Sequence, residues 1–279
     1  METSSSSCCS LSLSERDFVD DFVFMPPKRR TDSHYQHFNA LNYRGTRNRQ
    51  DERRDERIAI KLFKPIASLA AGLDHKPLVI FAHGNACDLF DMERPLQRLA
   101  NGLEVPILAF DYPGYGESQG VPSEASAYRA MARIVAYAET ELGYPTSRIF
   151  LCGQSLGTGV VTHYAYVNRD SWTTPIILIS PFRSIVKVVS TGPIGALASP
   201  LDRFQNETKF KDIKAPVKIY HGLSDQIIPA DHSRKLLWSL PEPLRLPPTW
   251  LPGIGHNDIL DAIPYDSLKL VLYGLVRSM

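Results

Sequence analysis

The sequence has few cysteines, no excess charge of either sign and no long apolar segment. Its 279 residues include four cysteines, and 31 basic against 30 acidic residues leave a formal net charge of +1. This balance provides no large positive field, so a nucleic-acid partner is not expected. No run approaches the ~18 consecutive apolar residues of a membrane-spanning helix, and the N-terminal residues lack a secretory signal pattern. We therefore expect a cytoplasmic protein in a reducing compartment.

Metal and cofactor motifs are also absent from the sequence. There is no C-x-x-C pair, no P-loop, no H-E-x-x-H pair and no EF-hand loop. Gly114, Gly116 and Gly120 resemble a dinucleotide loop, but G-x-G-x-x-G needs its third glycine at position 119, where the chain has Gln119. We expect no cofactor and no metal.

The length suits one large α/β core with an N-terminal extension. Residues 1–57 are expected to be this extension, partly disordered because they begin with a serine run and end in a mixed-charge linker at 44–57. Within it, apolar residues four apart at 18–25 favour a short helix that ends before Pro26-Pro27. Residues 58–279 are expected to form the catalytic domain.

From residue 58 onward, apolar runs of strand length alternate with amphipathic segments of helical length. This alternation predicts a mostly parallel twisted sheet with helices on both faces and no large lid domain. The predicted strands are 58–63, 78–82, 107–110, 149–152, 175–179, 217–220 and 249–251, and the predicted helices are 92–102, 123–142, 156–168, 230–240 and 265–277. The segment 183–212 is expected to be irregular with one short helix. Its apolar residues are expected either to line an acyl groove or only to cover the sheet; they are Ile194, Leu197, Leu201 and Phe204.

The most informative motif is Gly153-Gln154-Ser155-Leu156-Gly157, which follows the apolar run 149–152 directly. In a strand, turn and helix of this kind, a nucleophilic serine stands on a strained turn, and its neighbours at two residues on either side must be small. The pattern predicts an α/β-hydrolase fold with Ser155 as the nucleophile.

A nucleophilic serine needs a general base and an acid that orients the base, in the chain order Ser, Asp, His. Four histidines follow Ser155: His163, His221, His232 and His256. The first lies far along the helix, the second precedes the best acid and the third follows it without an intervening strand. His256 remains as the base, and Asp225 is the acid just beyond a predicted strand end, where parallel sheets place ligands.

Two backbone N–H groups are expected to hold the oxyanion that forms during acyl transfer. One belongs to Leu156, directly after the nucleophile, and the other to Asn85 in the loop after the strand 78–82. His83 in the same loop is interpreted as structural, and Cys87 as a small packing residue.

Six ordered motifs over residues 58–279 resemble the lidless α/β-hydrolase-domain proteins that include the depalmitoylating serine hydrolases. The motifs are His83-Gly84-Asn85-Ala86, Asp111 to Ser118 (DYPGYGES), Gly153 to Gly157 (GQSLG), Ser180-Pro181-Phe182, His221 to Asp225 (HGLSD) and Gly255 to Asp258 (GHND). The resemblance assigns the same triad, Ser155, Asp225 and His256. It implies two-step hydrolysis of acyl thioesters or esters, with S-acylated proteins as candidate substrates.

The N-terminal tail adds a weaker similarity to the depalmitoylating members. Their cysteine-rich N-terminus is acylated and precedes a Phe-x-Pro-Pro segment, which is similar here to Cys8-Cys9 followed by Phe24-Met25-Pro26-Pro27. The resemblance implies lipidation at Cys8 and Cys9 and peripheral contact with the cytosolic face of a membrane. Acidic neighbours in the tail depart from this pattern, since an anionic leaflet repels them. Two alternatives stay open for the whole chain: a lipid or small-molecule carboxylesterase, and a non-catalytic binding module.

Overall fold

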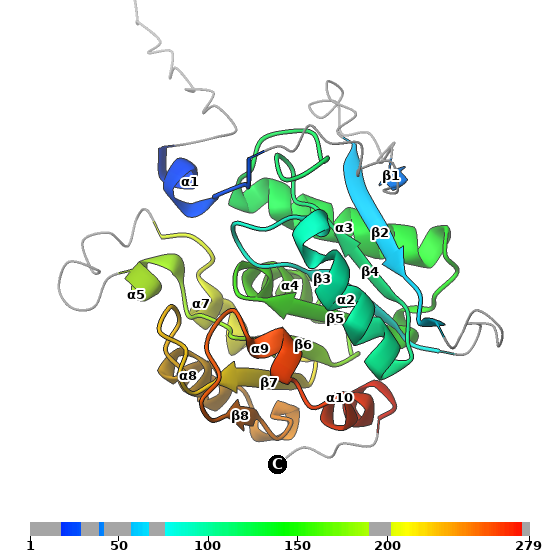
Figure 1. Cartoon of the computed structure of the whole chain (residues 1–279). Coiled ribbons are helices and arrows are strands. Elements are labelled where there is room, and N and C mark those ends of the chain that lie inside the picture. The colour runs from blue at the N-terminus through cyan, green and yellow to red at the C-terminus, as the bar shows by residue number, and fades with distance from the viewer. Residues whose placement is uncertain (1–17, 29–38, 42–56, 67–75, 190–201, 275–279) are drawn as a thin grey trace, which may run out of the picture.

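The computed structural model describes residues 18–28, 39–41, 57–66, 76–189 and 202–274. Within these residues, one sheet of eight strands has the order β1-β2-β4-β3-β5-β6-β7-β8 (Figure 1). The strands are β1 (Asn39–Leu41), β2 (Ile58–Phe63), β3 (Leu78–Ala82), β4 (Ile107–Phe110), β5 (Ile149–Gln154), β6 (Ile176–Ile179), β7 (Val217–Gly222) and β8 (Thr249–Leu251). Strands β3 to β8 pair in parallel, whereas β1 with β2 and β2 with β4 are antiparallel. The predicted α/β-hydrolase fold is confirmed.

Helices cover both faces of the sheet and enclose two separate apolar cores. The described helices are α1 (Phe18–Val23), α2 (Leu89–Leu103), α3 (Glu124–Thr140), α4 (Leu156–Val167), α5 (Ile185–Val189), α7 (Asn206–Phe210), α8 (Asp231–Ser239), α9 (Ile259–Ala262) and α10 (Tyr265–Leu272). Alternate residues of β3 enter different cores: Leu78 and Ile80 pack with residues of α3 and α4, while Val79 and Phe81 pack with residues of α2 and α10. A strand buried on both faces needs an unbroken apolar sequence, which explains its composition.

The sheet register brings the ends of β3 and β5 together. Ala82, the last residue of β3, pairs with Gly153 of β5. The loop after β3 and the turn after β5 therefore leave the same edge of the sheet side by side. Parallel α/β sheets bind their ligands at this edge.

Several short elements were not predicted. Strand β1 and helix α9 show no clear apolar pattern in the sequence. The segment 183–212, expected to hold one short helix, contains two, α5 and α7. Its residues 190–201 lie outside the described part. Such short elements are stabilised by tertiary contacts and not by their own propensity. Helix α2 begins three residues earlier than predicted because Asp88 caps it, accepting the N–H of Asp91 at 3.0 Å.

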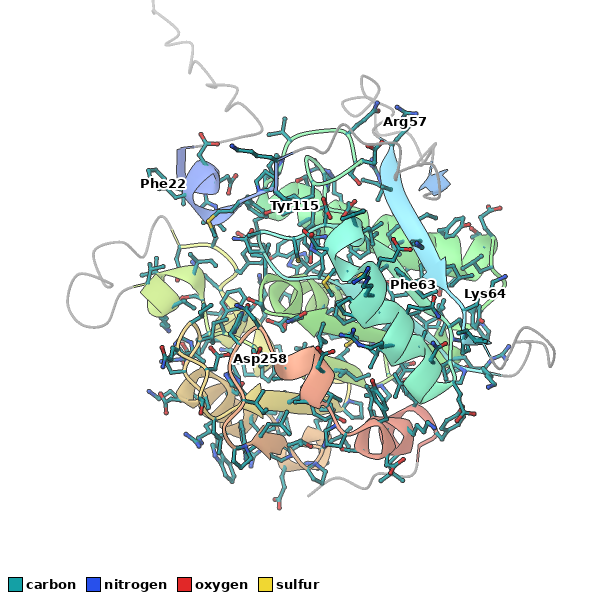
Figure 2. All side chains as sticks on the ribbon, viewed as in Figure 1. Phe22, Arg57, Phe63, Lys64, Tyr115 and Asp258 are labelled. Carbon is teal, nitrogen blue, oxygen red and sulfur yellow. The ribbon has the colours of Figure 1, made fainter. Side chains whose placement is uncertain are left out.

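The N-terminal segment 18–28 packs on the hydrolase fold. Its predicted short helix is α1, and Val23 and Phe24 belong to the same core as α3 and α4, whereas Phe22 points away from the sheet with 69% of its surface exposed (Figure 2). None of the helices in the described ranges is long and apolar enough to cross a membrane.

Candidate active site

Ser155 stands on a sharp turn between β5 and α4. Its backbone angles are φ 50° and ψ −117°, and its N–H donates to the Ile179 carbonyl at 2.9 Å. A residue with a side chain rarely adopts a positive φ, because Cβ then crowds the neighbouring carbonyl. The turn is thus strained, and the adjacent strand β6 holds it in place.

The two glycines of the motif are required by close backbone packing. A Cβ at position 157 would lie 2.0 Å from the Ala82 oxygen, and one at position 153 would lie 2.4 Å from the Gly157 oxygen. Each added Cβ would meet a backbone oxygen, which no side-chain rotation can move away. Gly153 and Gly157 therefore let helix α4 start directly against the end of β3.

The structure brings Ser155, His256 and Asp225 together from three separate elements. His256 Nε2 lies 3.0 Å from Ser155 Oγ, and His256 Nδ1 lies 2.7 Å from Asp225 Oδ2. Asp225 follows β7, and His256 stands in the loop between β8 and α9. This geometry can pass a proton from the hydroxyl to an imidazole that the carboxylate orients.

Backbone hydrogen bonds join the loops that hold the acid and the base. Leu223 N–H donates to the Leu251 carbonyl at 2.9 Å, and Ser224 N–H donates to the Ile254 carbonyl at 3.0 Å. A Cβ at Gly222 would lie 2.3 Å from the same Ile254 oxygen. The two loops thus form one unit at the end of β7 and β8.

Asp225 is held as a carboxylate. Its Oδ1 accepts the backbone N–H groups of Ile227 at 3.0 Å and Ile228 at 2.8 Å. Burial would raise the pKa of this side chain, but hydrogen bonds from His221, His256 and the Ile228 N–H outweigh it and hold the pKa well below its ordinary value. The negative charge is therefore present at neutral pH, where it can stabilise a protonated His256.

His221 is a site residue that sequence reasoning missed. The chain order excluded it as the base, but it is fully buried behind the acid, with Nε2 2.8 Å from the Ile228 carbonyl and 3.4 Å from Asp225 Oδ2. Nε2 thus faces two acceptors, which favours a proton on this nitrogen, and Nδ1 lies within hydrogen-bonding distance of Ser233 Oγ. The sequence signals were its position at a strand end, four residues before the acid, and its place as the first residue of the HGLSD motif.

The two residues expected to donate to the oxyanion belong to segments next to the nucleophile. Leu156 begins α4, so its N–H belongs to the first turn, where no intrahelical carbonyl is available. Asn85 lies in the loop after β3, which passes close to the nucleophile: a Cβ on Gly84 would lie 3.6 Å from Ser155 Cβ.

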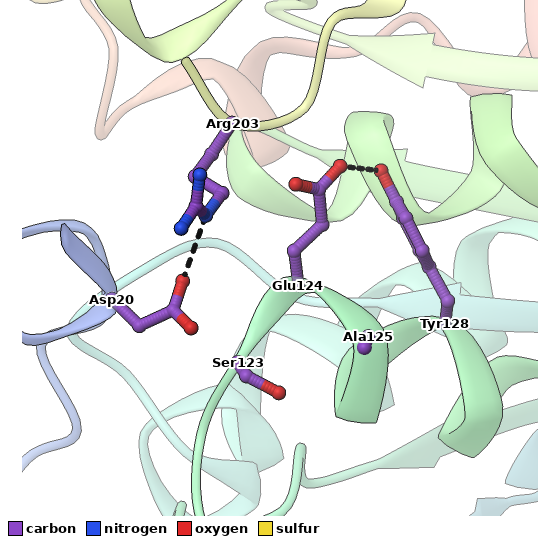
Figure 3. Close-up of a pocket in the computed structure, with 6 residues that line it drawn as sticks. All are labelled: Asp20, Ser123, Glu124, Ala125, Tyr128 and Arg203. Atoms are coloured by element: carbon purple, nitrogen blue, oxygen red, sulfur yellow. Dashed lines mark hydrogen bonds and ion pairs between the residues drawn. The ribbon is translucent and has the colours of Figure 1, made fainter. Parts of the chain in front are cut away.

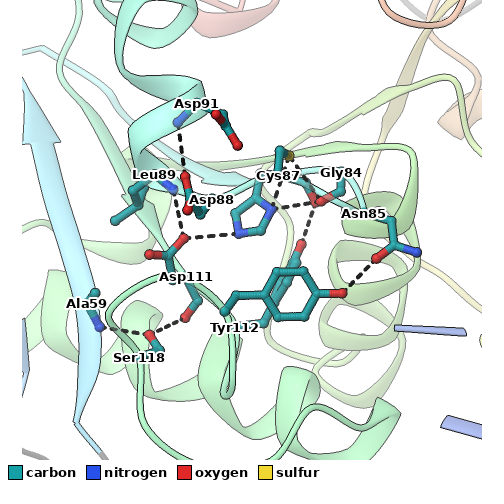
Figure 4. A network of polar contacts seen from close by, with 12 residues as sticks. Ala59, Gly84, Asn85, Cys87, Asp88, Leu89, Asp91, Asp111, Tyr112 and Ser118 are labelled. Atoms are coloured by element: carbon teal, nitrogen blue, oxygen red, sulfur yellow. Dashed lines mark hydrogen bonds and ion pairs between the residues drawn. The ribbon is translucent and has the colours of Figure 1, made fainter. Parts of the chain in front are cut away.

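A buried polar network stabilises the loop after β3 (Figure 4). His83 is fully buried, with Nδ1 2.8 Å from the Gly84 carbonyl and Nε2 3.5 Å from Asp111 Oδ1, and its own carbonyl accepts the Tyr112 hydroxyl at 2.7 Å. Cys87 Sγ contacts the Gly84 carbonyl at 3.3 Å. These contacts are those of structural residues.

Phe204 does not line an open groove. It is fully buried, and a Cβ on Gly159 of α4 would lie 2.5 Å from its ring. Ile194, Leu197 and Leu201, for which the same groove was expected, lie outside the described residues, as do Cys8 and Cys9. Within the described ranges, no group of three His, Cys, Asp or Glu side chains is arranged to hold a metal ion.

Comparison with known proteins identifies relatives of similar sequence. A putative alpha/beta hydrolase, L404, of Acanthamoeba polyphaga mimivirus is 38% identical over 195 residues, which are 70% of this chain and 72% of the relative. The alpha/beta hydrolase domain-containing protein aho-3 of Caenorhabditis elegans is 32% identical over 79% of this chain. The human alpha/beta hydrolase domain-containing protein 17B is also 32% identical, over 66% of this chain. The matches span 61% of the worm protein's length and 62% of the human protein's length.

Solved structures share the fold at low sequence identity. Est1E from Butyrivibrio proteoclasticus with bound ferulic acid has a TM-score of 0.63 and 19% identity, over 79% of this chain and 96% of Est1E. A soluble variant of monoglyceride lipase from Saccharomyces cerevisiae has a TM-score of 0.60 and 15% identity, over 91% of this chain and all of the lipase. The sequence model of the alpha/beta hydrolase family matches residues 79–272. This chain belongs to the alpha/beta hydrolase family.

Proposed function

We propose that this α/β hydrolase is a serine thioesterase that removes long acyl chains, such as palmitate, from S-acylated proteins. The observation that carries the proposal is the hydrogen-bonded row from Ser155 Oγ through His256 to Asp225, with distances of 3.0 and 2.7 Å. A nucleophile in contact with a base, and a base in contact with an orienting carboxylate, is the arrangement that acyl transfer requires.

In the first step, Ser155 Oγ attacks the thioester carbonyl carbon while its proton moves to His256 Nε2. The N–H groups of Leu156 and Asn85 hold the resulting oxyanion. The C–S bond then breaks, and His256 returns the proton to the departing sulfur. The products are a free thiol and an acyl group bound to Ser155.

In the second step, water attacks the acyl-enzyme on the same carbonyl carbon. His256 accepts one proton of the water. The bond between the acyl carbon and Ser155 Oγ then breaks, and His256 gives the proton to Ser155 Oγ, so the enzyme is regenerated and a carboxylic acid leaves. Asp225 stays ionised throughout because its pKa is held below the ordinary carboxyl value, and it stabilises each positive charge that forms on His256.

The thioester preference rests on the motif resemblance to depalmitoylating hydrolases and on leaving-group chemistry. A thiol has a pKa of about 8.5, far below that of an alcohol, so a thioester demands less proton donation from His256.

The motif resemblance also supports action at the cytosolic face of a membrane. Phe22 and Met25, exposed by 69% and 55%, stand on the segment that contacts the Asn85 loop. Sedimentation with phosphatidylcholine vesicles tests this location, and protein that stays in the supernatant would contradict it.

Active-site labelling tests the mechanism. A fluorophosphonate probe is expected to label the wild type and Ser171→Ala, whose serine is exposed beyond α4, but not Ser155→Ala. Equal labelling of Ser155→Ala would refute the assignment of the nucleophile. A folded wild type that is never labelled would favour a non-catalytic binding module.

A matched substrate pair tests the leaving group. S-palmitoyl-N-acetylcysteamine and O-palmitoyl-N-acetylethanolamine differ only in the atom that leaves. We expect kcat/KM to be at least about tenfold higher for the thioester. Faster turnover of the oxyester would instead identify a lipid or small-molecule carboxylesterase that uses the same triad.

A further inference from the structure

The segment that follows α1 reaches the predicted oxyanion loop, about sixty residues away in sequence. Phe24 is only 2% exposed, and its ring lies edge-on to Tyr115, with centroids 6.5 Å apart, and 5.8 Å from the ring of Phe204. Phe204 in turn packs against Gly159 of α4, the helix that begins at the nucleophile turn. Phe24 thus fills a pocket between the oxyanion side of the site and the helix behind Ser155.

The side chain of Asn85 binds the peptide groups on both sides of Phe24. Its Nδ2 donates to the Val23 carbonyl at 2.7 Å, and its Oδ1 accepts the Met25 N–H at 3.0 Å. The amide therefore pairs with the chain much as a neighbouring strand would. Tyr115 completes the contact by donating its hydroxyl to the same Oδ1 at 2.6 Å.

A second contact fixes the N-terminal side of this segment. Arg203 Nε donates to Asp20 Oδ1 at 3.1 Å. Both side chains line a pocket of about 290 Å³, which the beginning of α3 also lines (Figure 3). Asp20 is 6% exposed. A partly buried arginine and carboxylate pair orients both groups more strongly than a surface pair does.

We propose that residues 23–25 act as a clamp that positions the oxyanion loop, with Phe24 and the Asn85 side chain as its two halves. The inference rests on the proposed function, because it assumes that the Asn85 N–H stabilises the oxyanion. The hydrogen bonds of the Asn85 side chain orient the Asn85 backbone N–H. The buried Phe24 ring holds residues 23–25, to which that side chain binds, in place. The N-terminal segment is thereby a part of the catalytic unit.

Loss of the clamp is expected to lower kcat more than it changes KM. Removing one oxyanion donor outright costs about 10²- to 10³-fold in kcat, and a loosened donor costs less. We expect Phe24→Ala and Asn85→Ala each to lower kcat by about 10- to 100-fold, with KM changed by less than about threefold. Asn85→Ala keeps its backbone N–H, so any effect arises from the position of that group.

Kinetics of the full-length protein test the clamp, with p-nitrophenyl butyrate as the substrate. Phe22→Ala is the matched control because it removes an exposed ring two residues away, from the preceding helix α1. Phe24→Leu refills most of the pocket and should recover most of kcat. The double variant Phe24→Ala with Asn85→Ala is expected to lose no more kcat than the worse single variant, since both changes release the same contact.

Three outcomes would overturn the clamp. In the first, both single variants keep kcat within about twofold of the wild type. In the second, the losses of kcat multiply in the double variant. In the third, Phe22→Ala loses as much kcat as Phe24→Ala. Asn85→Ala leaves the aromatic pocket intact, so it tests the clamp even where Phe24→Ala fails to fold. Because p-nitrophenyl butyrate is a short ester, this assay does not depend on the preference for long acyl thioesters. Slow thioester turnover would contradict only the proposed substrate class. An unchanged kcat in the variants, beside an active wild type, would contradict only the clamp.

Discussion

The strained turn at Ser155 makes a prediction about stability that is independent of activity. At φ 50° and ψ −117°, this residue occupies a backbone region where glycine meets no steric cost. Replacing Ser155 by glycine should therefore relieve strain that replacement by alanine retains. Both changes remove the hydroxyl and its 3.0 Å contact with His256, so the difference between the two variants reports the backbone alone.

The magnitude follows from two opposing contributions. A residue with a Cβ in such a region costs about 1–3 kcal/mol, while glycine lowers stability by about 0.4–1 kcal/mol because it frees the unfolded chain. The net expectation is that Ser155→Gly is more stable than Ser155→Ala by about 1 kcal/mol. For a chain of this size, that corresponds to a Tm difference of about 2 °C or somewhat more.

Thermal and urea unfolding followed by circular dichroism measure this difference. The same pair of substitutions at Ser267, inside α10, provides a control with the opposite sign, because glycine in a helix costs about 1 kcal/mol relative to alanine. Both Ser267 variants lose the contact with Tyr220, so they too differ only in the backbone. A Ser155→Gly variant that is no more stable than Ser155→Ala would refute the strain argument.

Three further predictions concern the site and its surroundings. Asp225→Asn should lower kcat by about 10⁴-fold in a steady-state ester assay without unfolding the protein, because the base His256 loses its orienting charge; a loss below tenfold would contradict this role. Gly157→Ala should destabilise the fold by about 3 kcal/mol or more in urea unfolding, since its Cβ would meet the Ala82 oxygen at 2.0 Å, and an unchanged midpoint would contradict that packing. Burial and the nearby Lys209 charge lower the pKa of His163 to about 4. As the pH falls, His163 therefore binds a proton near pH 6.5 in the unfolded chain, but only near pH 4 in the folded chain. Stability should thus fall as pH drops through this window, and less so in His163→Phe; equal urea-midpoint losses between pH 7 and 4.5 would contradict it.

The central part of the fold was predictable because its signals are local. Strands β3 and β4 were predicted with their observed boundaries, since each is a short apolar run between turns. The strand, turn and helix around Ser155 were equally readable, because close packing leaves room only for glycine at the two flanking positions. The acid and the base could be selected only by chain order and by their places after strands, and the structure brings them within hydrogen-bonding distance of each other.

Contacts between distant segments could not be predicted in the same way. His221 was recognisable as the end of a strand and as the first residue of the HGLSD motif, but its contact with Asp225 depends on how the chain turns after β7. The motif predicts a role for the Asn85 backbone, but no sequence pattern indicates that its side chain binds the peptide groups next to Phe24. Each of these contacts follows from the folded positions of two loops, and no local pattern encodes it.

The N-terminal contacts also change how the domain boundary is best understood. Composition changes near residue 57, and a boundary there stays a prediction, but Val23 and Phe24 share a core with α3 and α4. A chain shortened to residues 58–279 would leave an apolar pocket empty and the Asn85 amide without two of its partners. Under the clamp hypothesis, the unit able to perform catalysis therefore begins before Phe24. Displacement of residues 23–25 would then change the position of the oxyanion loop, because the Asn85 side chain joins the two.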